Sequence, residues 1–247
     1  MATGILSIAA GLAGQPVLSI VLLALATIAL IALVVVDVHV AALHPDSIRS
    51  PRVALLLFTW VAACGVLGDS RGPLPEGVQL GVGALALAGW VVALGAVAFM
   101  LDRRVEGWRS WKVHGSWLLG VVATQSLAIL ASAAAQQSDA GVFLVAGLAL
   151  WLAGLATYIV LIMLIVRRHL GGGIGLDGFS PEYWIAMGAL AISTLAALDL
   201  NRTAASLGLL GGIRGGVATV AEATWGCAAA WIPYLCVVEL AHARSRG

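Results

Sequence analysis

The chain has 247 residues, of which 61% are hydrophobic and only 10% are charged, and its mean hydropathy is +1.03. A soluble domain carries about 25% charged residues, so this composition cannot build a water-exposed surface. The formal net charge is +1, which gives no bulk electrostatic basis for binding nucleic acid. These values predict a protein whose surroundings are a lipid bilayer.

Apolar residues form eight segments, separated by short stretches rich in glycine, proline and charge. The segments are Thr3–Gly14, Val17–Val40, Val53–Gly68, Val78–Leu101, Val113–Ala135, Gly141–Val166, Tyr183–Leu200 and Val217–Leu240. Lipid offers the backbone no hydrogen bonds, and the segments do not alternate in polarity as barrel strands do. We therefore expect an all-α fold, a polytopic transmembrane helical bundle that forms one domain over residues 1–247.

The first segment is shorter than a membrane span. As a helix, Thr3–Gly14 rises about 18 Å, whereas the hydrocarbon core of a bilayer is about 30 Å thick. Two explanations are open: Met1 is an internal start, so that the upstream half of this helix is missing, or the segment is a re-entrant helix. We favour the first.

Basic residues are distributed unevenly when the segments are alternated across the membrane. Ten lie on one side, namely Arg49, Arg52, Arg103, Arg104, Arg109, Lys112, Arg167, Arg168, Arg244 and Arg246. The other side holds only Arg71, Arg202 and Arg214. The positive-inside rule then predicts a multi-pass protein of the plasma (inner) membrane with both termini in the cytoplasm.

Small and polar residues are concentrated in the odd-numbered segments. The candidates are Thr3, Ser7, Gly11, Thr59, Gly65, Gly120, Thr124, Gln125, Ser126, Ser193 and Thr194. Such residues either let membrane helices pack closely or line a polar path between them. Gln125 favours the path, because a mid-membrane amide needs polar partners. The pore would be mostly uncharged and would select by size and hydration.

Two carboxylates lie near the external helix ends. Asp199 and Glu222 are placed to pair with Arg202 and Arg214, and we favour this structural role over proton coupling, although either residue could serve in a proton-linked transporter.

The sequence contains no clear pattern of residues that would bind a metal ion or a cofactor. The three cysteines show no CxxC spacing, and the five histidines lie near segment ends without a spaced pair on one helix. We expect no metal site, no cofactor and no enzymatic activity.

Three strings carry a family resemblance: Met1–Ala10 (MATGILSIAA), Gly115–Ser126 (GSWLLGVVATQS) and Pro181–Leu195 (PEYWIAMGALAISTL). They are similar to the first, fifth and seventh helices of the tellurite-resistance/dicarboxylate transporter family, which includes the plant slow anion channels and fungal malate permeases. Their order and spacing extend the resemblance over essentially the whole chain.

The resemblance implies helices arranged as antiparallel hairpins, with odd helices inside, even helices outside and a central anion pathway. It also implies a homotrimer that transports monovalent anions or dicarboxylates, as a channel or with proton linkage. The family has ten helices, so we expect this chain to lack part of helix one and helices nine and ten. A truncated remnant that does not transport, or an assembly partner, is the alternative; an intramembrane cofactor protein is a third.

Overall fold

The computed structural model describes residues 6–7, 10–11, 13–43, 51–68, 76–103, 114–171 and 181–245. Within these ranges the fold is helical and contains no strand, so the predicted all-α class is confirmed. The helices are α2 (Pro16–Leu43), α3 (Pro51–Gly68), α4 (Glu76–Arg103), η3 (Gly115–Leu118), α5 (Leu119–Ser138), α6 (Gly141–Leu170), η5 (Pro181–Tyr183), α7 (Trp184–Ser206) and α8 (Arg214–Ser245).

Six of these helices are long and apolar enough to cross a membrane: α2, α4, α5 with η3, α6, α7 and α8. Several continue past the predicted segments. α7, for example, runs through Asp199 and Arg202 to Ser206. Hydropathy falls where charges begin, but a helix continues into the interface because its backbone bonds are still satisfied internally.

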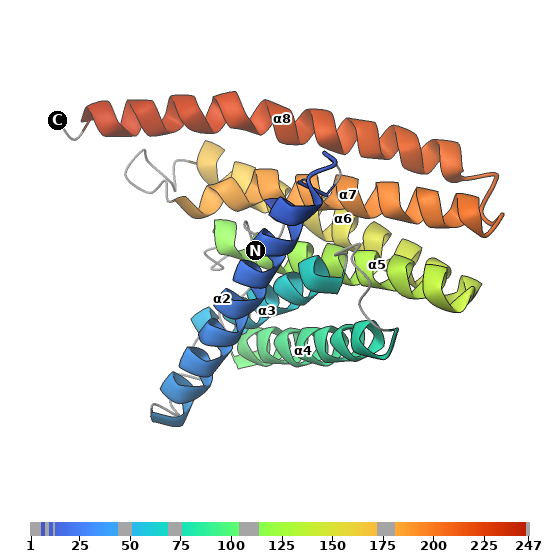
Figure 1. The fold of residues 1–247 in the computed structure, drawn as a ribbon. Helices are drawn as coiled ribbons and strands as arrows, with labels where there is room; N and C mark the ends of the chain where they lie inside the picture. The colour runs from blue at the N-terminus through green and yellow to red at the C-terminus, as the bar shows by residue number, and fades with distance from the viewer. Residues whose placement is uncertain are drawn as a thin grey trace.

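Helices α3 to α8 run roughly along one direction in Figure 1, with α8 and α4 on opposite sides of the bundle. α3 packs on α4 and α5, α5 on α6 and α7, and α7 on α8. α2 crosses the others at a steep angle and packs mainly on α3. The turn before α2 uses Gly14 at a φ of 73°. Of the first segment, residues 6–7 and 10–11 are helical and described.

Burial separates odd helices from even ones, as the sequence predicts. Within the membrane-crossing windows, 78% of residues are buried in η3–α5 and 56% in α7, against 0% in α2, 11% in α4, 28% in α6 and 17% in α8. The even helices leave their large apolar side chains on the outside, where acyl chains solvate them. Residues 61–66 of α3 are buried as well, so the inner layer of the bundle is built from α3, α5 and α7.

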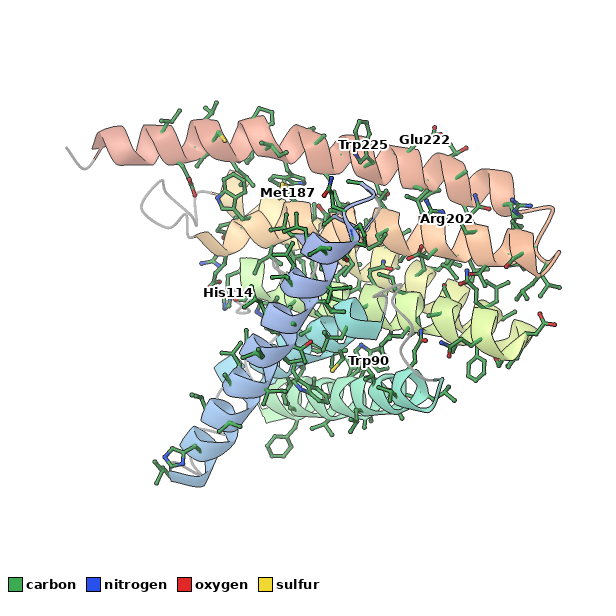
Figure 2. The ribbon with its side chains drawn as sticks, viewed as in Figure 1. Trp90, His114, Met187, Arg202, Glu222 and Trp225 are labelled. Carbon is green, nitrogen blue, oxygen red and sulfur yellow. The ribbon has the colours of Figure 1, made fainter. Side chains whose placement is uncertain are left out.

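Tryptophan side chains of the outer helices form hydrogen bonds to neighbouring helices of the bundle. Trp90 of α4, which is labelled in Figure 2, donates to Thr124 Oγ1 of α5 at 3.0 Å. Trp151 of α6 donates to the Ser193 carbonyl of α7 at 3.0 Å. A buried indole N–H needs an acceptor, and helices in lipid gain little from hydrophobic burial, so these bonds help to fix the helix order.

A third bond of this kind gives a stability prediction. Trp231 of α8 donates to the Tyr158 hydroxyl of α6 at 3.1 Å. Replacing Tyr158 by Phe removes the acceptor, and we expect the free energy of unfolding to fall by about 0.5–1.5 kcal/mol. The measurement is reversible unfolding in mixed micelles. Tyr234→Phe is the control, because that side chain is exposed; an equal loss in both variants would contradict the prediction.

Polar groups mark the two ends of the bundle. Trp184 donates to Glu239 at 2.7 Å at one end, and Asp199 lies toward the other end of α7. Trp184 and Asp199 are 15 positions apart, or about 22 Å along a helix. Glu222 and Glu239 are 17 positions apart on α8, or about 26 Å. Both spacings are shorter than the hydrocarbon core of about 30 Å, so the polar groups lie within about one helical turn of its two edges.

Candidate functional site

The candidate side chains of α5 point toward different neighbours. Thr124 donates to the Gly120 carbonyl at 2.8 Å and accepts from Trp90 of α4. Gln125 is fully buried and donates through Nε2 to the Trp151 carbonyl of α6 at 3.2 Å. Its Oε1 is buried without a hydrogen bond among the described residues. Thr124 thus contributes to the contact of α5 with α4, and Gln125 contributes to its contact with α6.

Ser126 lies on the α3 side of α5. It donates to the Val122 carbonyl at 2.9 Å and is fully buried. A Cβ placed on Gly65 of α3 would lie 2.4 Å from the Ser126 Cβ, so these two helices approach closely only because residue 65 is glycine. Nearby, Gly120 faces the ring of Phe58, with 3.7 Å from its ideal Cβ position to the ring. Gly65, Gly120 and Ser126 therefore form the α3–α5 interface.

The hydroxyls of α7 also face two different helices. Ser193 is fully buried, donates to the Ala189 carbonyl at 2.7 Å and offers its own carbonyl to Trp151 of α6. Thr194 donates to the Leu190 carbonyl and lies 2.9 Å from the Thr224 hydroxyl of α8. The hydroxyls that bond to the preceding turn in this way offer little hydrogen-bonding capacity to a solute.

The remaining candidates lie on the first segment and α3. Ser7 is buried and donates to the Ser19 carbonyl of α2 at 2.7 Å, and a Cβ on Gly11 would lie 3.3 Å from the Ser19 Oγ. Thr59 is half-buried on α3. Thr3 lies outside the described residues. The structure therefore buries most of the described candidates but divides them among several helix contacts, rather than gathering them around one axis.

Helical spacing identifies the faces of α5 and α7 that carry none of these polar candidates and pack through apolar side chains such as Val122, Ile129 and Leu195. On α5, Val122, Ile129 and Ala133 lie between the α3 contact at Ser126 and the α7 contact at Gln136, whose amide donates to Thr203 at 2.9 Å. This inner face of α5 is apolar.

On α7, the face away from α6 and α8 carries Gly188, Leu195 and Asp199. A Cβ on Gly188 would meet nothing within 4 Å, so space is open beside it. Gly188 was not among the residues predicted from the sequence. The spacing of seven and eleven positions from Gly188 to Leu195 and Asp199 is the signal that could have found it.

The two carboxylates have different surroundings. Asp199 is buried, and its Oδ1 lies 3.7 Å from Nη1 of Arg202. Glu222 is exposed and points away from α7 on the outer side of α8 (Figure 2). Arg214 donates to the Asn201 Oδ1 at 3.0 Å. Asp199 and Arg202 thus belong to the inner layer at this end, and Glu222 does not.

Metal-ligating side chains are not clustered in the described ranges, where no group of three or more His, Cys, Asp or Glu residues could hold a metal ion. Cys64 is buried, whereas Cys227 and Cys236 are exposed on α8.

The fold and this site define a multi-pass membrane protein in which α5 carries no charged side chain and α7 carries none between Trp184 and Asp199. A comparison with protein-family models identifies the family: the model described as SLAC1, voltage-dependent anion channel, matches residues 1–245. The chain belongs to this family, so the resemblance noted in its sequence is confirmed, and the family is one of anion channels and transporters. Comparisons with curated proteins and with solved structures gave no match.

Proposed function

We propose that the chain conducts small monovalent anions passively along a narrow path bounded by α3, α5 and α7. The observation that carries this proposal is the burial of α5 and α7 inside a layer of lipid-facing helices, in a chain whose family transports anions. The inner faces of α5 and α7 supply the lining, with Val122, Ala133, Gly188 and Leu195 along its length. Ser126 lies at its edge.

The chemistry of these residues favours weakly hydrated monovalent anions. α5 carries no charged side chain, and α7 carries none between Trp184 and Asp199. An ion on this path gives up hydration without a fixed counter-charge, and that loss is much larger for a dicarboxylate than for nitrate. Selection then rests on ion size and hydration, and an apolar constriction of this kind can close by losing its water.

We further propose that Arg202 attracts anions at the end of the path. Its side chain is 54% exposed while it pairs with Asp199, so its charge reaches solvent. Both termini would lie on the opposite, cytoplasmic side of the inner membrane, and the assembly would be a homotrimer.

The charge of Arg202 gives a testable expectation. Arg202→Gln should lower chloride flux several-fold at low ionic strength and much less at high ionic strength, because salt screens the attraction. Glu222→Gln is the control and should leave flux unchanged, since that carboxylate faces away from the path. Flux that is equally low at both salt concentrations would instead indicate a structural role for Arg202.

The proposed function is tested by anion flux into liposomes that contain the purified full chain. We expect nitrate and chloride to enter faster than in empty liposomes, and malate to enter far more slowly. Flux should be passive, so a proton gradient alone should not drive accumulation. Correctly folded protein that admits none of the three anions would overturn the proposal, and malate uptake coupled to protons would replace it with a carrier.

A further inference from the structure

Three polar side chains meet at the end of the bundle that is opposite Asp199. The His114 Nδ1 lies 2.5 Å from the Ser116 Oγ, which donates to the Glu182 Oε2 at 2.7 Å. Nδ1 and Oε2 are 3.1 Å apart, so the three atoms form a closed triangle. His114 directly precedes η3 and α5, and Glu182 lies in η5, directly before α7. The triangle therefore joins the starts of the two most buried spans. Figure 2 labels His114 at this end of the bundle.

The close contact between the starts of α5 and α7 requires a glycine at residue 115. A Cβ on Gly115 would lie 2.3 Å from the Glu182 carbonyl oxygen and 2.8 Å from the Tyr183 backbone nitrogen. Because those atoms belong to the backbone, no side-chain movement could relieve the overlap. The two helix starts are thus in direct backbone contact beneath the triangle.

Charged groups on two neighbouring helices, Arg168 and Glu239, lie close to Tyr183 and Trp184, which follow Glu182 in the sequence. Burial raises the pKa of Tyr183 above its ordinary value, Arg168 of α6 lowers it, and Glu182 raises it, so the phenol is uncharged at neutral pH. Glu239 of α8 accepts from Trp184. The side chains of His114 and Glu182 are 43% and 48% exposed, so protons from solvent reach the triangle.

The protonation state of His114 decides how strongly the three side chains of the triangle attract one another. The Ser116 hydroxyl has one proton and uses it toward Glu182, so the contact between Oγ and Nδ1 requires a proton on Nδ1. A protonated imidazole supplies that proton together with a positive charge facing the carboxylate. A neutral imidazole supplies no charge, and in one tautomer supplies no proton at Nδ1. Histidine is the side chain that makes this change between pH 5 and 8.

We infer that the His114–Ser116–Glu182 triangle is a proton-operated latch at the mouth of the anion path. The latch draws the starts of α5 and α7 together at mildly acidic pH and releases them as histidine loses its proton. This inference rests on the proposed function, because the mouth it controls is that of the proposed path. A closed latch narrows the mouth, so anion flux is lower at pH 6 than at pH 8.

The first test is chloride flux in liposomes of the full chain, with the same pH on both sides. We expect flux to be several-fold lower at pH 6 than at pH 8, and this difference to disappear in His114→Gln and in Glu182→Gln. His39→Gln is the matched control, since His39 is exposed on α2, and it should keep the difference. A wild-type flux that is independent of pH or higher at pH 6, or a pH dependence that survives in both latch variants, would overturn the inference.

The second test needs no flux and so separates failure of the latch from failure of the proposed function. Hydrogen exchange of peptides covering residues 114–120 and 181–187 is measured at both pH values and corrected for the intrinsic exchange rate. Protection should be greater at pH 6 than at pH 8, and equal at both in His114→Gln. Equal protection at both pH values in the wild-type chain would overturn the latch, even if the protein conducts anions.

Discussion

Placing a phenylalanine at residue 188 should abolish anion flux without unfolding the protein. The ideal Cβ of Gly188 meets nothing within 4 Å, so α7 has room for a side chain there. The same face of α7 carries Leu195 and Asp199 and bounds the proposed path, so the ring would occupy the space that an ion needs. We expect chloride flux through Gly188→Phe to fall at least tenfold in liposomes.

A matched control separates blockage from a general effect of adding a ring to a helix. Gly95 lies on the outer helix α4, and its ideal Cβ also meets nothing within 4 Å. Gly95→Phe should therefore retain flux, and both variants should unfold at about the temperature of the wild-type protein. Full conduction by a folded Gly188→Phe variant would exclude this face of α7 from the path.

Valine at residue 65 should have the largest effect on stability. The Cβ of any side chain there would lie 2.4 Å from the Ser126 Cβ and 3.0 Å from the Ser126 Cα, so α3 and α5 must separate. Overpacking a tight core costs about 1–3 kcal/mol, and here the obstacle includes backbone. We expect Gly65→Val to lower the free energy of unfolding by about 3 kcal/mol or to prevent folding.

Two further variants make this prediction specific to the α3–α5 contact. Gly81→Val on α4 adds the same side chain where nothing lies within 4 Å, and should be nearly neutral. Gly65→Ala should be less harmful than Gly65→Val, and adding Ser126→Gly should recover part of its loss because the closest atom is removed. A Gly65→Val variant as stable as Gly81→Val would show that the two helices do not pack in this way.

Hydropathy and polarity were sufficient to predict the class of fold and its layering. A long apolar segment in lipid has few alternatives to a helix, so the helical class follows from composition. Polarity also indicated which helices lie outside, because α2, α4 and α6 are almost entirely apolar whereas α5 and α7 carry hydroxyl groups. The ends were less accurate, because α7 continues beyond the predicted end at Leu200, through Arg202 to Ser206, where hydropathy falls.

The direction of individual side chains could not be predicted in the same way. Thr124 and Gln125 are adjacent, yet one faces Trp90 of α4 and the other faces Trp151 of α6. Their polarity indicated only that each needs a partner inside the bundle; which partner depends on the rotation of α5 against its neighbours. Packing of the whole bundle decides that rotation.

Hydrogen bonds between residues far apart in the chain could not be predicted from the sequence either. Ser116 and Glu182 are 66 positions apart, and nothing in either local pattern indicates that they bond. Gly188 was missed for a different reason. A glycine inside a membrane helix is common and usually serves packing; Gly188 differs because it has open space beside it although it lies on a helix of the inner layer.

Chemical modification of a cysteine at residue 188 tests most directly whether anions pass along the inner faces of α5 and α7. A negatively charged methanethiosulfonate reagent is applied to liposomes that contain Gly188→Cys, and chloride flux is measured before and after; the wild-type chain controls for Cys64, Cys227 and Cys236. We expect modification to abolish flux in the variant alone, and permeant anions to slow the reaction. Unchanged flux after complete modification would contradict a path beside Gly188.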